Sequence, residues 1–186
     1  MTGWKDKRRV MKRYDLTAEM YEERYSEEQA TKYRAALENV KLTGGSVLDV
    51  GCGTGLFFSH VVQSAGLVVG VDISRKLLSK AEVEAKKSSN VSVLVADADH
   101  LPLRDGLFEA AFAFTVLQNM PKPEETLLEL ERVTKINGSV VVTGLKKAFP
   151  LDKFLKILEC VGLKGSSFVD SEDLKCYVAV LIKQQN

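Results

Sequence analysis

From residue 44 onward, short apolar runs alternate with stretches in which apolar residues recur every three or four positions. The short runs are typical of buried strands, and the longer stretches are typical of amphipathic helices. Because each of these runs carries at most one charged residue, we expect strands that are buried on both faces, as in a parallel sheet covered by helices. The predicted strands are 46–50, 67–71, 91–95, 109–116, 139–145, 167–169 and 174–182.

The helices predicted between these strands each have an apolar stripe and recognisable ends. Ser74 is a suitable N-cap for one of them. Another starts at Pro123 and is expected to end at the turn of Asn137 and Gly138. The predicted helices of this part of the chain are 56–64, 74–87, 123–137 and 151–160. Further helices are expected ahead of the sheet, where apolar residues also recur at helical spacing.

The chain of 186 residues has the size of one domain. No internal repeat, low-complexity segment or linker marks a boundary within it. We therefore expect residues 1–43 to form a basic arm and helices, and residues 44–186 to form the core of the same structural domain. The fold class is α/β, with helices on both faces of the sheet.

Lys and Arg number 26 and Asp and Glu 25, so the net charge of +1 excludes a general attraction to nucleic acid or acidic membranes. The three cysteines form no CxxC pair, and no Cys or His cluster has zinc-ligand spacing. This pattern predicts a cytoplasmic protein in a reducing compartment, without a metal site. No signal peptide and no run of about 18 apolar residues is present, so no membrane association is expected.

Charge is concentrated in one place, the first 13 residues. Asp6 is the only acidic residue there, against the cations Lys5, Lys7, Arg8, Arg9, Lys12 and Arg13. Charge runs of this kind are most often solvated tails. The alternative is that the cations contact nucleic acid phosphates.

The most informative segment joins the first predicted strand to the helix after it. It reads Asp49-Val50-Gly51-Cys52-Gly53-Thr54-Gly55. Glycines adopt backbone conformations closed to other residues, and they let a ligand lie against the main chain at a helix N-terminus. Ligands of open α/β sheets bind at this edge, outside the carboxyl ends of the strands.

Two further acidic residues follow neighbouring strands at the same edge. Asp72 ends the second strand, 21 residues after Gly51, where a carboxylate can accept hydrogen bonds from ribose hydroxyls. Asp97 follows the third strand, where an acceptor suits an exocyclic amine such as that of adenine. The glycines are spaced GxGxG, and position 56 is Leu, which argues against the GxGxxG fingerprint of a nicotinamide dehydrogenase.

With these motifs in this order, residues 44–182 resemble the class I S-adenosylmethionine-dependent methyltransferases. The segment 96–105, ADADHLPLRD, is especially similar to that family. The resemblance implies a doubly wound, Rossmann-like sheet of seven mostly parallel strands in the order 3-2-1-4-5-7-6, with the last strand antiparallel. It also implies a methyltransferase enzyme with S-adenosylmethionine as its cofactor.

The resemblance further implies roles for single residues. The glycine turn would hold the methionine end, Asp49 its amino group, Asp72 the ribose, and Asp97 with the Ala98 backbone the adenine edge. Tyrosines ahead of the sheet would close the pocket, although they suit helix packing equally well. The full set of expected cofactor-binding residues is Asp49, Gly51, Cys52, Gly53, Gly55, Asp72, Ile73, Asp97, Ala98, Thr115, Tyr14 and Tyr21.

Gln118 and Asn119 follow the fourth predicted strand and are the candidate catalytic residues. Amine methyltransferases often carry Asn or Asp, two prolines and an aromatic residue there. This sequence has the amide and Pro121 alone, so the resemblance to them is incomplete. A side-chain carbonyl at this place would accept from an amine nucleophile and direct its lone pair at the methyl group. The alternative is that either amide caps the loop before Pro121.

The acceptor molecule is inferred from what the chain lacks. The connection between residues 145 and 151 is short and no insertion is evident, which predicts an open acceptor face. With the basic arm, this favours RNA, and the 96–119 region is similar to small RNA methyltransferases that work with a zinc-binding activator subunit. The strand Val91–Val95 lies at an edge in the implied order and has no Pro or Lys to block pairing, so we expect such an activator there.

Two alternatives remain open at this point. The chain could be a small-molecule methyltransferase, of the quinone or metabolite type, that uses its N-terminal helices as a lid. It could also be a cofactor-binding subunit without catalytic activity.

Overall fold

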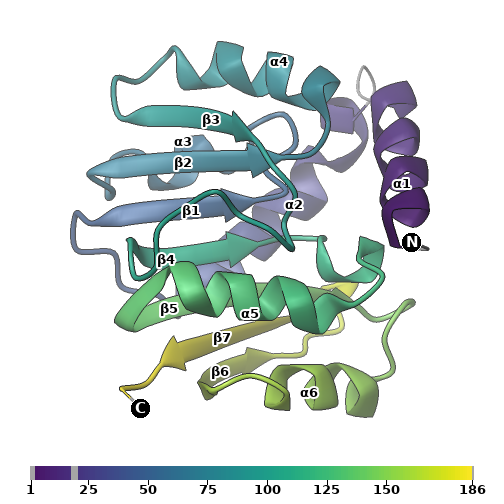
Figure 1. Cartoon of the computed structure of the whole chain (residues 1–186), viewed down its shortest axis with the longest axis vertical. Coiled ribbons are helices and arrows are strands. Elements are labelled where there is room, and N and C mark those ends of the chain that lie inside the picture. The colour runs from purple at the N-terminus through teal and green to yellow at the C-terminus, as the bar shows by residue number, and fades with distance from the viewer. Residues whose placement is uncertain (1–2, 18–20, 186) are drawn as a thin grey trace.

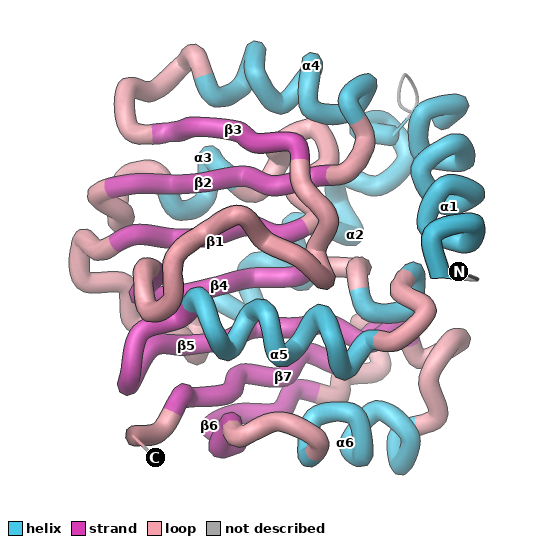
Figure 2. The backbone as a smooth tube through the Cα atoms, in the orientation of Figure 1, coloured by secondary structure: helices cyan, strands magenta, loops and turns pink. Residues whose placement is uncertain are grey.

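The computed structural model describes residues 3–17 and 21–185. Seven strands form one sheet in the order β3-β2-β1-β4-β5-β7-β6, and only β7 runs opposite to the other six strands (Figures 1 and 2). The strands are β1 (Ser46–Val50), β2 (Leu67–Asp72), β3 (Val91–Val95), β4 (Phe108–Ala113), β5 (Thr134–Leu145), β6 (Leu163–Val169) and β7 (Cys176–Lys183). This order and the antiparallel last strand confirm the expected fold.

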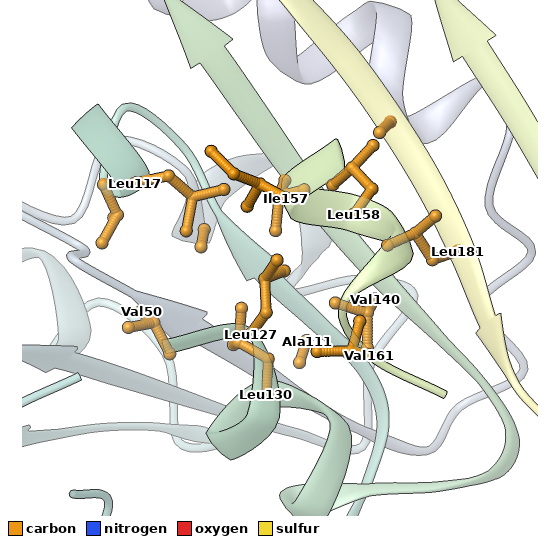
Figure 3. Close-up of a cluster of buried hydrophobic side chains, with 14 of the residues drawn as sticks. Val50, Ala111, Leu117, Leu127, Leu130, Val140, Ile157, Leu158, Val161 and Leu181 are labelled. Atoms are coloured by element: carbon orange, nitrogen blue, oxygen red, sulfur yellow. The ribbon is translucent and has the colours of Figure 1, made fainter. Parts of the chain in front are cut away.

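Helices cover both faces of this sheet. They are α1 (Gly3–Thr17), α2 (Tyr21–Leu37), α3 (Phe58–Val61), α4 (Arg75–Ala85), the 3-10 helix η1 (Leu117–Asn119), α5 (Pro123–Val133) and α6 (Leu151–Glu159). One face packs against α5 and α6, where Leu127, Leu130, Ile157 and Leu158 meet strand residues such as Val140 (Figure 3). The other face packs against α2, α3 and α4.

An aromatic cluster on this second face fixes the ends of two central strands. The ring centroid of Phe57 lies 4.7 Å from that of Phe112 and 5.0 Å from that of Phe114. Tyr33 of α2 packs on Phe114 at 4.7 Å. Offset and edge-on aromatic pairs of this kind hold their partners in defined positions. The cluster therefore ties α2 and the turn after β1 to the end of β4.

The structure corrects several predicted boundaries. The helix expected over 56–64 is only Phe58–Val61, because residues 51–57 form successive turns. The helix expected over 123–137 ends at Val133, since Thr134 adopts an extended conformation and begins β5. The fourth strand ends at Ala113 rather than Val116 because Thr115, with φ of 63°, turns the chain away from the sheet.

The ends of the last two strands also differ from the prediction. The hairpin is longer, because β6 begins at Leu163 instead of Ser167 and β7 extends to Lys183. The earlier start of β6 reflects backbone pairing of exposed residues, which alternation of apolar and polar residues does not reveal.

The basic segment forms the helix α1. In Figure 1, α1 lies beside the carboxyl ends of the parallel strands. Its outer surface exposes the cations Lys5, Arg8, Arg9, Lys12 and Arg13, whereas Lys7 is buried. No helix of the described residues is both long and apolar enough to cross a membrane.

Candidate functional site

The glycine turn after β1 has the backbone conformation that only glycine adopts readily. The φ angles of Gly51, Gly53 and Gly55 are 71°, 57° and 86°. A Cβ atom built on Gly51 would lie 2.5 Å from the Cγ2 atom of Val116, so no larger residue fits there without a shift. The turn therefore presents bare main chain at the carboxyl edge of the sheet.

Asp72, at the end of β2, anchors this turn. One of its carboxylate oxygens accepts from the Gly53 amide at 3.0 Å, and the other accepts from the Ser74 amide at 2.8 Å. Burial raises the pKa of Asp72 above its ordinary value, although these backbone hydrogen bonds oppose the shift. The carboxylate is thus held in one position beside the glycines.

Asp49 lies in β1 and is 3% exposed. Burial, and secondarily the charge of Asp72, raises the pKa of Asp49 to about 8. A cation placed beside it would favour the ionised form and lower that pKa. Asp49 is therefore suited to bind a positively charged ligand group.

Two adjoining cavities lie at the carboxyl ends of β1, β2 and β3. The larger one brings together these expected residues: Tyr14, Gly51, Gly53, Asp72, Ile73, Asp97, Ala98, Thr115 and Asn119. The smaller one is lined by Asp49 and Cys52 and shares Gly51 and Gly53 with the first.

Three expected residues are not placed in these cavities. Gly55 and Gln118 are not among the described residues that line either one, and the side chain of Tyr21 lies outside the described part of the structure. The hydroxyl of Thr54, which lines the smaller cavity and is 1% exposed, has no hydrogen-bond partner among the described residues.

The end of β3 carries an ion-pair cluster that the sequence did not reveal. The Nζ atom of Lys7 in α1 lies 2.7 and 2.8 Å from the two carboxylate oxygens of Asp97 and 2.5 Å from an oxygen of Asp99. The other Asp99 oxygen accepts from the hydroxyl of Thr126 in α5. Burial by itself would lower the pKa of Lys7, but its bonds to the two carboxylates outweigh this and raise it.

The loop after β4 forms the opposite rim of the larger cavity. Thr115 has a positive φ of 63°, which is unusual for a β-branched residue. Its amide donates to the hydroxyl of Thr143 at 2.8 Å, and its own hydroxyl lies 3.4 Å from the Nζ atom of the buried Lys32. Backbone strain of this kind clusters at functional sites.

Asn119 connects this rim to α1. Its Nδ2 atom donates to the Tyr14 hydroxyl at 3.1 Å and to the Thr115 carbonyl at 2.8 Å, and its Oδ1 atom accepts from Arg13 at 2.9 Å. Gln118 points elsewhere, and its Oε1 atom is buried with no partner among the described residues. The two candidate catalytic residues therefore differ in position, and only Asn119 faces the cavity.

Sequence reasoning missed Lys7 and Val10, which line the cavity together with Tyr14. The three residues are spaced i, i+3 and i+7, so they fall on one face of a helix. That spacing was visible in the sequence, but a lysine on the face gave no reason to regard it as buried.

Comparison with known families places this site in context. A family model described as a methyltransferase domain matches residues 48–142, slightly more than half of the chain. The chain therefore belongs to this methyltransferase family, and its sheet order is that of the class I S-adenosylmethionine-dependent methyltransferases.

Two curated relatives show how far the similarity extends. The malonyl-[acyl-carrier protein] O-methyltransferase of Hamiltonella defensa subsp. Acyrthosiphon pisum is 29% identical over 140 residues, which cover 75% of this chain and 53% of that protein. The demethylmenaquinone methyltransferase of Staphylococcus saprophyticus is 37% identical over 106 residues, which cover 55% of this chain and 45% of that protein. The chain thus spans about half of the length of these relatives.

Solved structures share the fold. A chain in the complex between the Haloferax volcanii Trm112 methyltransferase activator and a methyltransferase matches with a TM-score of 0.76 at 16% identity, covering 92% of this chain and 98% of that one. An S-adenosylmethionine-dependent methyltransferase from Aquifex aeolicus matches with a TM-score of 0.72 at 21% identity, covering 82% of this chain and 89% of that one.

Proposed function

We propose that the chain binds S-adenosylmethionine across the two cavities and transfers its methyl group to a small molecule. S-adenosylmethionine is the methyl donor of class I methyltransferases. The donor set fits this cofactor, since a buried carboxylate, a bare glycine turn and an unpartnered Thr54 hydroxyl adjoin one another in the smaller cavity. Two further carboxylates follow at the ends of β2 and β3.

In this proposal each residue has a binding role. Asp49 and the glycine turn hold the charged amino acid end, and Asp72 accepts from the ribose hydroxyls. Ile73 packs on the adenine, while Asp97 accepts from its amine. The cofactor supplies a methyl group already activated by its sulfonium, so the protein's task is chiefly to align the acceptor with that carbon.

The acceptor is inferred to be small because α1 covers the cavity. The sequence predicted an open acceptor face. In the structure, Lys7, Val10 and Tyr14 of α1 line the larger cavity, which favours a covered acceptor site. This helix wall is the observation that favours the lid arrangement over an open surface for a macromolecule. The names of the two relatives, a malonyl-[acyl-carrier protein] O-methyltransferase and a demethylmenaquinone methyltransferase, support the same choice.

Cofactor binding can be tested first and by itself. Calorimetry with S-adenosylhomocysteine and with NAD should show binding of the first and not of the second. Binding of NAD instead would overturn the cofactor assignment.

The acceptor is tested by incubating the protein with cofactor labelled in its methyl group and with fractions of its source cells. Label in the organic-soluble or small-metabolite fraction supports the proposal, and label in RNA overturns it. Label in no fraction, from a protein that binds the cofactor, would favour a subunit without catalytic activity.

Asn119 supplies a second test of acceptor alignment. Asn119→Ala should lower turnover 10 to 100-fold, roughly 1.4 to 2.7 kcal/mol, if its amide orients the nucleophile. Cofactor affinity should change little, because the amide contributes chiefly to the alignment of the attack. Gln118→Ala is the matched control, since Gln118 does not line the cavity. Normal turnover in Asn119→Ala would assign the amide to loop structure only.

RNA remains the second candidate because one observation favours it. Four exposed cations of α1, Lys5, Arg8, Arg9 and Lys12, do not line the cavity, and their exposure gives phosphates access to them in the manner expected of RNA contacts. If they do, binding of a labelled RNA should weaken steeply as salt rises from 50 to 200 mM, and Lys5→Gln with Arg9→Gln should reduce that slope. RNA binding without salt dependence would argue against contacts of this kind.

We also infer that a partner protein pairs with β3. This strand ends the sheet, and Leu94 and Val95 are 36% and 43% exposed. The structural neighbour solved with the Trm112 activator supports the existence of such partners in this fold. In a pull-down from source cells, a partner retained by the unmodified protein should be lost with Leu94→Asp and kept with Leu128→Asp, which changes a leucine on α5 that is 50% exposed. Equal retention by both variants would contradict binding at β3.

A further inference from the structure

The ammonium group of Lys7 stands at the adenine end of the proposed cofactor pocket. Lys7, Ile73, Asp97 and Ala98 all line the larger cavity, and the last three are the residues assigned above to adenine. Lys7 contacts both oxygens of Asp97, at 2.7 and 2.8 Å. Oδ1 of Asp97 also accepts from the Asp99 amide at 3.1 Å. A carboxylate has about four acceptor positions, so three of those of Asp97 are already occupied.

The same lysine has a second partner that does not face the adenine position. Asp99 lies 2.5 Å from Lys7, is buried, and is held by Thr126. Lys7 can therefore give up its contact with Asp97 without being left as an unpaired buried charge, which would be very unfavourable. The structure has Lys7 on both carboxylates, and the position of Asp99 permits a second arrangement with Lys7 on Asp99 alone.

We propose that Lys7 competes with the adenine amine of the cofactor for Asp97, so that cofactor binding loosens α1 from the loop after β3. Lys7 is a cofactor-competing residue under this proposal, and it makes α1 respond to whether the cofactor is bound. The proposal rests on the proposed function, because it requires S-adenosylmethionine or its product to occupy the larger cavity. It predicts that removing the ammonium group strengthens cofactor binding.

The first experiment compares the affinity of three proteins for S-adenosylhomocysteine by calorimetry. Lys7→Met should bind three- to tenfold more tightly than the unmodified protein, because the competitor is gone while Asp97 is kept. Lys12→Met, which removes an exposed cation of the same helix, should bind as the unmodified protein does. If Lys7→Met does not fold, Lys7→Gln is used, since its neutral amide is also a weaker competitor for the carboxylate.

The second experiment uses the unmodified protein. Trp4 is the only tryptophan of the chain and lies on α1, three residues before Lys7, so its fluorescence anisotropy reports the mobility of this helix. Saturation with S-adenosylhomocysteine should lower the anisotropy toward the value of ligand-free Lys7→Met. Unchanged anisotropy in a protein that binds the ligand, or affinity in Lys7→Met that is equal or weaker, would overturn the proposal and leave the proposed function intact. A protein that binds no S-adenosylhomocysteine at all would overturn both.

Discussion

The two walls of the cavity are built in different ways. The sheet wall consists of strand ends and the glycine turn, where bare main chain and short carboxylates are fixed by hydrogen bonds such as that from Gly53 to Asp72. The helix wall consists of side chains of α1, which are held by contacts between residues 90 and 105 positions apart, Lys7 with Asp97 and Tyr14 with Asn119. Local geometry specifies the first wall, whereas only tertiary packing specifies the second.

Substitutions in the two walls should therefore have different effects. Changes in the sheet wall should abolish or strongly weaken cofactor binding, because its backbone cannot adapt. Changes in the helix wall should alter the mobility of α1 more than the affinity for the cofactor, except at Lys7, whose ammonium group is proposed to compete with the cofactor.

The largest effect is expected from Gly51→Ala. A Cβ atom there would strain a backbone with φ of 71° and lie 2.5 Å from Val116. Strain and overpacking each cost about 1–3 kcal/mol, so stability should fall by about 2–6 kcal/mol in urea unfolding. Because the turn must move, the affinity for S-adenosylhomocysteine should fall more than 100-fold.

Gly44→Ala is the matched control for this change. Gly44 also has a positive φ, 89°, but nothing lies within 4 Å of the position of its added Cβ. It should lose about 1–2 kcal/mol of stability from backbone strain alone and keep the cofactor affinity. Equal loss of affinity in both variants would show that general destabilisation, and not the shape of the turn, is responsible.

Asp72→Ala is expected to have the next largest effect. Loss of a charge-assisted acceptor for the ribose should cost about 1.5–3 kcal/mol of binding free energy, roughly 10 to 150-fold in Kd. Ser74→Ala controls for damage to the same junction, since it removes the N-cap bond to Leu77 but no proposed ligand contact. Calorimetry in which the two variants bind the ligand equally well would remove Asp72 from the site.

The sheet wall could be predicted from the sequence, and the reason is physical. Asp49, Asp72 and Asp97 each lie at or just after the carboxyl end of a predicted strand, and in a parallel sheet these ends share one edge. The order of the strands came from the family resemblance, because pairing between distant segments leaves no mark in local patterns.

The helix wall could not be predicted in the same way. The cations of residues 5–13 look alike in the sequence, yet Lys7 is buried and its neighbours are exposed. What distinguishes Lys7 is a pair of carboxylates supplied by the loop after β3, and this pairing exists only in the folded chain. Thr115 likewise gave no sign of its positive φ, since that conformation is imposed by its surroundings.

Cofactor binding at the sheet wall should depend on pH through Asp49. The pKa of Asp49 is raised to about 8 in the protein, so the group is mostly protonated at pH 7. A bound cation favours the carboxylate, and binding of S-adenosylmethionine at pH 7 should therefore release a proton. Affinity should rise about tenfold between pH 6.5 and 8 through this group, as measured by calorimetry in buffers that differ in ionisation enthalpy.

Asp49→Asn is the control, because the amino group of the ligand titrates in the same range and its contribution remains in the variant. The two proteins should also differ in unfolding. The native pKa of Asp49 exceeds its unfolded value, so this group's contribution to stability is lost as pH rises from about 4 toward 8. The urea midpoint of Asp49→Asn should rise relative to that of the unmodified protein between pH 6 and 8. A difference between the two midpoints that stays constant over this range would contradict the raised pKa.

The smallest effect is expected from Tyr14→Phe, which removes one hydrogen bond of the helix wall, that from Asn119 at 3.1 Å. The ring remains to line the cavity, so the affinity for S-adenosylhomocysteine should change less than threefold. Loss of the bond should weaken the docking of α1 by about 0.5–1.5 kcal/mol, and hydrogen exchange of the α1 amides should accelerate by roughly 2 to 12-fold. Asn119→Ala, which also removes the bonds to Arg13 and Thr115, should accelerate it further. A large loss of affinity in Tyr14→Phe with unchanged exchange would mean that this tyrosine binds the cofactor directly, and the helix wall would then resemble the sheet wall in how it acts.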